Sequence, residues 1–491
     1  MAEIQLRQHR TFVFSFYIYR STACLMRWDR VGAIVSEPID LETESPKFYE
    51  FFYRLGAATD LQLGFDPTAI VLYKDVEADA DVIALRHAVA EIPPESRIHP
   101  YISKAFEGDR WPFYRLSVPD RDDATKSRTF LVRNLSSHSI SPTGRATKGY
   151  IAFDTDTKEF RFLKNAWRPQ SKDIPVELDV YRDLERNNVQ GTATVCCGGD
   201  LPSQTTKTDK LTKDYLQRVH TRLVLNEVGM PLKDYLCSRE LCTAVLDAYQ
   251  AHDDAWTKAG ILHRDISEGN IVLFVNPITG VVEGLLIDWD LCKYRSKLRD
   301  GPTQKSRSGT WRFLSAALVN FLLKGNEVSD DIESFFHLLV LFALRFHCPH
   351  LDTEDVKGVL TGVYDKSSIR KGFWIGSLSK LQSVCAGTLP FVMKPNSPLA
   401  SLLDALIAIC KEHYASLDLD DLAKRYGIPE DPENGPSGVG APPPDLPRIP
   451  LTKYQRYATA PEPIPEVPQV AASKHHPLLN DHKAFGEALF R

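Results

Sequence analysis

Two short strings in the second half of the chain hold residue types that could bind a metal ion and accept a proton. HRDISEGN, residues 263–270, is followed by DWD at residues 288–290. Asn270 and Asp288 could each give an oxygen ligand to a metal ion. Asp265 could accept the proton of a hydroxyl group. Whether these side chains form one site depends on the segment between the strings.

The intervening segment, IVLFVNPITGVVEGLLI, has the pattern of a β-hairpin. Its two apolar runs flank Asn-Pro and Thr-Gly dipeptides at residues 276–280, which are turn signals. The two ends of an antiparallel hairpin lie about 5 Å apart across the ladder. We therefore expect Asn270 and Asp288 to converge, and oxygen ligands of this kind suit Mg²⁺. Asp265, five residues before Asn270, would face the same space.

Candidates for binding phosphate lie upstream. GRATKG, residues 144–149, has the form GxAxxG, and a glycine-rich turn between two strands lets backbone amides cover phosphates. Lys164, in FRFLKNAWR, lies near the end of the next predicted strand. The following string, IPVELDVYRDL, is predicted to form a helix with Glu177, Tyr181 and Leu184 on one face. Glu177 is the expected ion partner of Lys164.

With these strings in order, the chain resembles the protein kinases, and more specifically the fungal-type protein kinase family. The strings that carry the resemblance are MRWDRVGAIVSEP (26–38), GRATKGY (144–150), LKNAW (163–167), LVLNEVGMPL (223–232), GILHRDISEGNI (260–271), LIDWD (286–290), GTWRFLS (309–315) and DDIESFFH (330–337). The resemblance covers roughly residues 10–420. It implies an α+β, two-lobed protein-kinase-like fold, with ATP and Mg²⁺ as cosubstrates and Ser/Thr phosphorylation as the activity.

The resemblance also implies a role for each candidate residue. Asp265, Lys164 and Asn270 would be catalytic, and Asn270 and Asp288 would hold Mg²⁺. Asp331 would accept a hydrogen bond from the backbone of the catalytic loop. The residues implied to bind the nucleotide are Gly144, Ala146, Gly149, Ile151, Lys164, Glu177, Glu227 and Val228. The last two belong to the segment 226–229, which would bind adenine and link the two lobes.

Several positions depart from ordinary Ser/Thr kinases. Ser267 stands where they carry a lysine that contacts the γ-phosphate, and Ala316-Ala317 replaces the Pro-Glu that anchors the activation segment. Asp290 replaces the glycine of DFG, where an unusual backbone conformation could be needed. A solvated turn residue is the favoured interpretation of Asp290, and a third carboxylate beside the metals is the other. Phe162 either narrows the nucleotide pocket or points to the opposite face of its strand.

These departures keep two alternatives to a Ser/Thr protein kinase open. The first is a kinase that phosphorylates a small molecule, because the lysine and the Pro-Glu both serve peptide substrates. The second is a pseudokinase or scaffold that binds nucleotide without transferring phosphate. The occupied catalytic positions argue against the second alternative. The sequence does not identify a protein substrate.

Composition excludes several classes of partner. The net charge of −5 provides no basic surface for nucleic acid or for a membrane. The longest apolar stretch, residues 335–346, contains a histidine and is too short to span a bilayer, so it is predicted to be a buried helix. The nine cysteines form no CxxC pair, which favours a reducing compartment. We expect a cytoplasmic protein, with the nucleus as the alternative.

The chain is predicted to have three regions. Residues 1–125 form an N-terminal α/β extension with a hairpin over residues 12–28; its apolar first strand leads us to expect that the chain begins inside a larger domain. Residues 126–425 form the kinase-like domain, with the small lobe at about 126–229 and the large lobe at about 230–425. Residues 426–491 are predicted to be a disordered tail, because twelve of the 32 prolines lie between 429 and 468. A plain tail is favoured over one that docks a partner.

Overall fold

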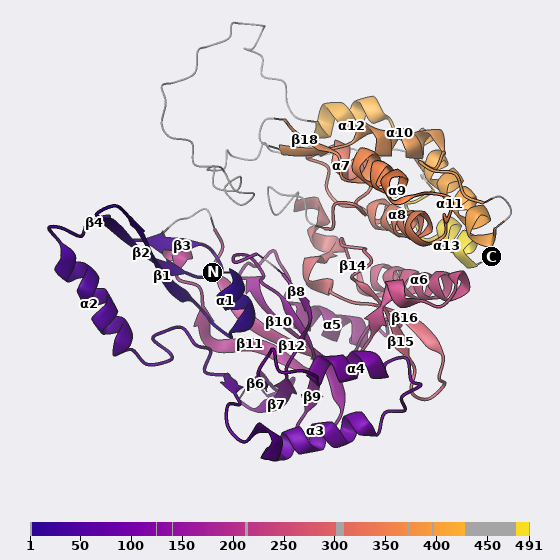
Figure 1. Ribbon diagram of the computed structural model, residues 1–491. Helices are drawn as coiled ribbons and strands as arrows, with labels where there is room; N and C mark the ends of the chain where they lie inside the picture. The colour runs from indigo at the N-terminus through magenta and orange to yellow at the C-terminus, as the bar shows by residue number, and fades with distance from the viewer. Residues whose placement is uncertain are drawn as a thin grey trace, which may run out of the picture. The chain divides into compact units, whose positions relative to one another are not determined.

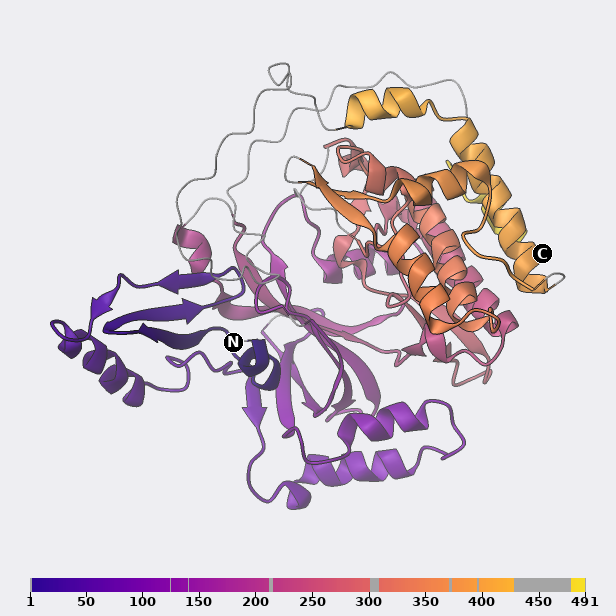
Figure 2. The same ribbon diagram turned by 45° about the horizontal axis from the view of Figure 1, so that its top comes forward.

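The protein is a mixed α+β protein with antiparallel sheets (Figures 1 and 2). The computed structural model describes residues 2–123, 125–139, 141–211, 215–300, 309–370, 373–394, 397–427 and 478–490. The chain divides into two compact units, the first comprising residues 1–263 and 268–295 and the second comprising residues 264–267 and 296–491. Within the described ranges, every helix is too short or too polar to cross a lipid bilayer.

The first unit contains most of the described strands. Its N-terminal elements are α1 (Ala2–Arg7), β1 (Val13–Tyr19), β2 (Thr22–Trp28), β3 (Ala33–Val35), β4 (Ile39–Asp40), α2 (Ser45–Gly56), β5 (Ala69–Val71), α3 (Ala80–Ala90), α4 (His99–Phe106) and β6 (Tyr114–Pro119). They are followed by β7 (Ser127–Val132), β8 (Leu135–His138), β9 (Lys148–Asp154), β10 (Phe160–Pro169), α5 (Glu177–Arg186), β11 (Val195–Thr205) and β12 (Arg218–Leu225). The last elements are β13 (Met230–Pro231), α6 (Ser238–Asp254), β14 (Ile261–Leu262), β15 (Ile271–Val275), β16 (Val282–Leu286) and β17 (Lys293–Tyr294).

The predicted N-terminal hairpin is confirmed. Strands β1 and β2 pair in antiparallel register, with Tyr19 opposite Thr22 at the turn. Helix α2 comes after β4, and the rings of its Phe48 and Phe52 pack edge to face on Phe16 of β1. Aromatic contacts of this geometry stabilise the packing beyond the area they bury.

An eight-stranded antiparallel sheet forms the centre of the first unit. Its strand order is β11-β12-β10-β9-β7-β6-β5, with β8 also paired to β9. The boundary predicted between the N-terminal extension and the kinase-like domain, at residues 125/126, falls within this sheet, between β6 and β7. Gly149 lies opposite Lys164, and Ile151 lies opposite Phe162. Because residues two apart along a strand point to the same face, Phe162 lies on the face of Lys164 rather than on the opposite one.

Helices α3 and α4 cover part of that face (Figure 1). One apolar cluster joins them to the sheet and contains Val82, Leu85, Ile102, Ala105, Phe106, Phe113, Leu131, Ile151 and Phe153. Helix α4 is also bound to the segment before α6, since Tyr101 Oη donates to Asp234 Oδ2 at 2.6 Å. The N-terminal region therefore completes the core of the sheet.

A buried ion pair ties the N-terminal region to β12. Arg222 Nη2 lies 2.5 Å from Asp66 Oδ2, and both side chains are fully buried. The guanidinium also donates to Thr68, to the carbonyl oxygen of Ser117 at 2.6 Å and to Asn165 Oδ1 at 2.9 Å. A buried ion pair with its remaining donors satisfied avoids much of the cost of taking charges out of water.

The hairpin predicted between Asn270 and Asp288 is confirmed as β15 and β16. Asn276 closes its turn, with its side-chain Oδ1 accepting from the backbone N–H of Ile278 at 2.9 Å. The hairpin packs on α6 at Gly284, whose position leaves no room for a side chain. A Cβ there would lie 2.0 Å from the carbonyl oxygen of Ala244.

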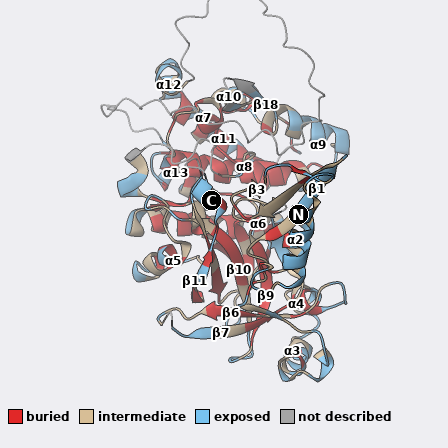
Figure 3. Ribbon diagram, turned by 90° about the vertical axis from the view of Figure 1, so that its left-hand side faces the viewer, coloured by how far each residue is buried: buried red, intermediate tan, exposed pale blue. Residues whose placement is uncertain are grey.

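The second unit is mostly helical in its described part. Its elements are α7 (Ala316–Asn320), α8 (Val328–Phe346), α9 (Thr353–Val359), β18 (Ser367–Arg370), β19 (Phe373–Gly376), α10 (Leu378–Ala386), α11 (Pro398–Ala415), α12 (Leu419–Tyr426) and α13 (Lys483–Phe490). Helix α8 contains the apolar stretch predicted to be a buried helix, and it is buried from Val328 to Leu344 (Figure 3). A capping box of Glu327 and Asp330 begins it.

The prediction that residues 426–491 form a disordered tail is wrong at the C-terminal end of this range. Residues 478–490 are ordered, with Leu479, Phe485 and Leu489 buried, and α13 packs against α11. The backbone N–H of Leu479 donates to His413 Nδ1 at 3.4 Å. Phe485 and Leu489 are four residues apart and so share one helix face, a signal that the proline-rich composition obscured. The proline-rich part, residues 428–477, lies outside the described residues.

Candidate active site

Lys164 of β10 lies among three carboxylates. Its Nζ is 2.7 Å from Glu177 Oε2, 2.7 Å from Asp288 Oδ1 and 3.3 Å from Asp290 Oδ2. The lysine side chain is 8% exposed, so these interactions are shielded from water. The predicted ion pair between Lys164 and Glu177 is confirmed. Strand β10, the first turn of α5 and the segment after β16 together position the cluster.

The close carboxylates shift one another's proton affinity. Burial raises the pKa of Glu177, with a further rise from Asp288 and Asp290, although Lys164 acts in the opposite direction. Burial likewise raises the pKa of Asp290, aided by Asp288. Burial opposes ionisation of Asp288 too, but the charges of Lys164 and Arg145, together with the hydrogen bonds to the carboxylate, outweigh it and lower the pKa of that carboxyl. Asp288 is therefore the carboxylate most firmly held in its ionised form.

The hairpin ends meet as the sequence predicted. The backbone N–H of Ile287 donates to the carbonyl oxygen of Asn270 at 2.9 Å. The unusual backbone conformation, however, is at Asp288, where φ is 65°, and not at Asp290. An aspartate tolerates this left-handed region better than most residues. The backbone N–H of Asp288 donates to Tyr181 Oη at 3.3 Å, which ties the segment to α5.

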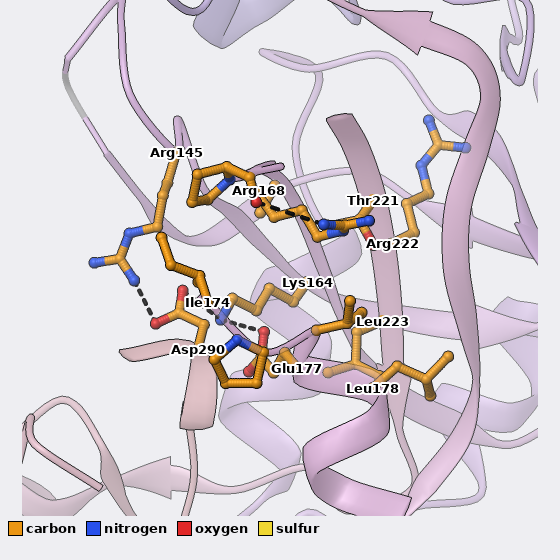
Figure 4. Close-up of a pocket in the computed structure, with 14 residues that line it drawn as sticks. Arg145, Lys164, Arg168, Ile174, Glu177, Leu178, Thr221, Arg222, Leu223 and Asp290 are labelled. Atoms are coloured by element: carbon orange, nitrogen blue, oxygen red, sulfur yellow. Dashed lines mark hydrogen bonds and ion pairs between the residues drawn. The ribbon is translucent and has the colours of Figure 1, made fainter. Parts of the chain in front are cut away.

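The favoured interpretation of Asp290 as a solvated turn residue is wrong. Its side chain is 15% exposed and lies between Lys164 and Arg145, whose Nη1 donates to Asp290 Oδ1 (Figure 4). Arg145 is not among the site residues that the sequence predicted. The available signal was an arginine in the glycine-rich loop together with an acidic residue in place of the DFG glycine.

Backbone hydrogen bonds hold the glycine-rich loop, residues 144–149, to neighbouring segments. Gly144 has a φ of 88° and donates its backbone N–H to the carbonyl oxygen of Arg30 at 2.8 Å. The carbonyl oxygen of Arg145 accepts from the backbone N–H of Trp167 at 2.8 Å. Ala146 has a φ of 44°, so it adopts a conformation that usually favours glycine. Gly149 lies within β9, against the ring of Phe162.

Three other predicted nucleotide contacts make interactions with residues outside the carboxylate cluster. Ile151 belongs to the apolar cluster shared with α3 and α4, and Val228 packs against that cluster. The carboxylate of Glu227 accepts from the backbone N–H and the hydroxyl of Thr194, each at 2.7 Å. The backbone of residues 226–229 therefore remains the candidate for binding adenine.

The second unit holds Asp265 in a separate set of hydrogen bonds. Asp265 Oδ1 accepts from the backbone N–H and the hydroxyl of Thr310, each at 2.8 Å. Asp331 Oδ2 accepts from the backbone N–H of Arg264 at 2.7 Å, which confirms the hydrogen bond predicted for it. Glu333, which the sequence reasoning missed, accepts from the backbone N–H of Ala316 at 2.8 Å and so anchors the segment that lacks Pro-Glu.

The donor set of the first unit fits Mg²⁺. Glu177, Asp288 and Asp290 each offer a carboxylate oxygen, and these oxygens lie within 4.8 Å of one another. Hard oxygen ligands are those that Mg²⁺ prefers. Lys164 and Arg145 add positive charge beside the carboxylates, as a site for a nucleotide's phosphates requires.

A strand lysine paired with a helical glutamate, beside an aspartate at the end of a hairpin, is the arrangement of a protein-kinase phosphate site. The sequence comparison agrees with this class, because a model of the family described as fungal protein kinase matches residues 2–202 and 199–343. The chain belongs to this family, as its sequence led us to expect. Membership indicates a kinase-like, phosphotransferase function. No curated protein matches the chain.

Proposed function

We propose that the protein is a Ser/Thr protein kinase that uses ATP and Mg²⁺. The observation that carries the proposal is the position of Lys164 Nζ, 2.7 Å from both Glu177 and Asp288. In a kinase, the glutamate orients such a lysine toward the α- and β-phosphates, and the aspartate faces the metal. Asp288 and Asn270 would hold Mg²⁺, which when bound neutralises charge on the phosphates.

Individual residues of the chain then have separate roles in phosphate transfer. Asp265 orients the substrate hydroxyl and accepts its proton. The hydroxyl oxygen forms a bond to the γ-phosphorus, while the bond from that phosphorus to the oxygen of ADP breaks and its electron pair leaves with ADP. Lys164 stabilises the leaving phosphates. Catalysis of this kind rests mainly on positioning and electrostatics.

Asp265→Asn tests the role of the proposed base. Asparagine can still accept from Thr310 but cannot take the proton, so we expect turnover to fall about 10²–10⁴-fold with unchanged thermal stability. Asp288→Asn should abolish transfer, because it removes a ligand charge. Asp420→Asn, at an exposed position on α12, is the matched control. Phosphate transfer is followed by mass spectrometry of full-length protein incubated with Mg-ATP, and undiminished turnover in Asp265→Asn would refute the assignment.

A small-molecule acceptor remains the second candidate because of Ser267. The missing Pro-Glu is a weaker reason. The backbone N–H groups of Ala316 and Ala317 donate to Glu333 and to Tyr414 Oη, and these hydrogen bonds anchor that segment instead. Radiolabelled phosphate should appear on proteins when the enzyme is incubated with a protein library. Label confined to a metabolite pool would favour the second candidate.

A further inference from the structure

Arg145 reaches from the glycine-rich loop to the carboxylates around Lys164. Its Nη1 donates to Asp290 Oδ1, and the other oxygen of the same carboxylate lies 3.3 Å from Lys164 Nζ. The arginine side chain is 37% exposed and Asp290 is 15% exposed, so the guanidinium lies at the more open side of the pair. One carboxylate thus joins a cation from the loop to a cation from β10 (Figure 4).

The position of Arg145 is set by the backbone as well as by its long side chain. The carbonyl oxygen of Arg145 accepts from Trp167 N, and the preceding amide, of Gly144, donates to Arg30 O, each at 2.8 Å. Gly144 has a positive φ, so the loop turns sharply where the arginine begins. Both sides of the residue are therefore anchored, and the guanidinium is directed to the site by the fold.

Space is available beside this pair. A pocket of the first unit has Arg145, Lys164, Glu177 and Asp290 among its charged lining residues, and Ile174 and Leu178 among its apolar ones. A group bound in this pocket would lie beside both cations, because Arg145 and Lys164 both line it. The three carboxylates make the site unsuitable for a bare anion, but suitable for a phosphate that carries a divalent cation.

Phosphate transfer requires positive charge beside the γ-phosphate, and a side chain such as Arg145 can supply it. Negative charge on the γ-phosphate must be stabilised during transfer, and Ser267 stands where ordinary kinases have a lysine for this purpose. A guanidinium is suited to the task because its planar fork binds two phosphate oxygens at once. Its five N–H donors also allow it to keep a carboxylate partner while it binds phosphate.

We propose that Arg145 contacts the γ-phosphate of ATP and replaces the lysine missing at position 267, with Asp290 as its positioning residue. This inference rests on the proposed function. Arg145 neither gains nor loses a proton in the transfer, and the bonds that form and break are those already described. It also explains why the glycine of DFG is replaced by an acidic residue in a chain whose phosphate loop carries an arginine.

The affinities for a non-hydrolysable Mg-ATP analogue and for Mg-ADP test the inference, because only the first ligand has a γ-phosphate. We expect Arg145→Gln, in the full-length protein, to weaken analogue binding about ten- to a hundredfold in calorimetric titrations and to leave ADP binding unchanged. Arg145→Lys keeps the positive charge but not the planar guanidinium. It should therefore lose less affinity for the analogue than Arg145→Gln does. Arg168→Gln is the matched control, since Arg168 lines the same pocket but pairs with Asp200.

A double-mutant cycle tests Asp290. If Asp290 acts by positioning Arg145, Asp290→Asn should reduce the preference for the analogue over ADP in the wild-type chain but not in Arg145→Gln. An unchanged preference in Arg145→Gln, or an equal loss for both nucleotides, would overturn the inference and leave the proposed function standing. A wild-type protein that binds neither nucleotide would overturn the proposed function and this inference with it.

Discussion

Asp331 fixes the backbone that precedes the proposed catalytic base. It is 2% exposed, and its carboxylate accepts from the backbone N–H of Arg264, which has a φ of 71°. A hydrogen bond to a buried charge contributes about 1.5–3 kcal/mol, and here it also stabilises a left-handed conformation that arginine rarely adopts. Asp331 thus supports Asp265 through one intervening residue.

We predict that Asp331→Ala lowers the free energy of unfolding by about 1.5–3 kcal/mol and lowers kcat more than it raises KM for ATP. The reason is that the loop bearing Asp265 loses a backbone anchor, while Lys164 and Asp288 are left in place. Urea unfolding and steady-state kinetics measure the two effects. Asp331→Asn, which can still accept the hydrogen bond, should retain more activity; equal losses in both variants would contradict this explanation.

For individual residues, the sequence predicted the pairs whose spacing is characteristic of the family. Lys164 with Glu177, and Asp331 with the catalytic loop, could be paired because each lies in a recognisable string. Arg145 and Asp290 are 145 residues apart, and neither is expected in ordinary kinases. Only the folded chain shows that a loop arginine reaches the acidic residue that replaced a glycine.

The β15–β16 hairpin has no room for a side chain at Gly284. Gly284 faces the backbone of α6, and its N–H donates to Asp247 Oδ2 at 2.9 Å. A methyl group here would overlap a carbonyl oxygen, which cannot move without shifting the helix. Because Asp288 lies two residues after the end of β16, a shift of the strand would also move the proposed metal ligand.

Gly284→Ala should therefore lower stability by about 1–3 kcal/mol and reduce phosphate transfer. Thermal unfolding and the transfer assay report the two losses. The matched control is Gly358→Ala on α9, where a Cβ would meet nothing within 4 Å. The control should leave stability unchanged or raise it by up to about 1 kcal/mol. A stable, fully active Gly284→Ala protein would show that α6 and β16 are not rigidly packed.

Elements whose signals are local were predictable, and those that depend on distant partners were not. The hairpin of β15 and β16 follows from turn residues next to apolar runs, and the burial of α8 follows from its mostly apolar stretch at residues 335–346. The packing of α3 and α4 on Ile151 and Phe153 has no such signal, because the partners lie far apart in the chain. Helix α13 was missed because a long proline-rich segment precedes it.

Across the whole molecule, buried histidines make stability depend on pH. Burial lowers the pKa of His252 in the first unit to about 3, and that of His337 in the second unit to about 4, from 6.5. Between these values and 6.5 the unfolded chain binds protons that the folded chain does not. Stability must therefore fall as the pH decreases through this window.

Each such histidine should cost about 1.4 kcal/mol of stability at pH 5.5 relative to pH 7.5. Urea midpoints at the two pH values measure the loss. In His337→Gln the side chain can still donate to Glu333 but does not titrate, so the loss in the second unit should be smaller than in the wild-type protein. An identical pH dependence in the two proteins would mean that His337 is not responsible.

The buried pair of Asp66 and Arg222 has a consequence for the order of events during synthesis. Asp66 leaves the ribosome first, and its partner follows 156 residues later. At a translation rate of roughly 5–20 residues per second, about 8–30 s pass between the synthesis of Asp66 and that of Arg222. Until β12 emerges, Asp66 cannot be buried at low cost, so the N-terminal region reaches its final packing only after most of the first unit has been translated.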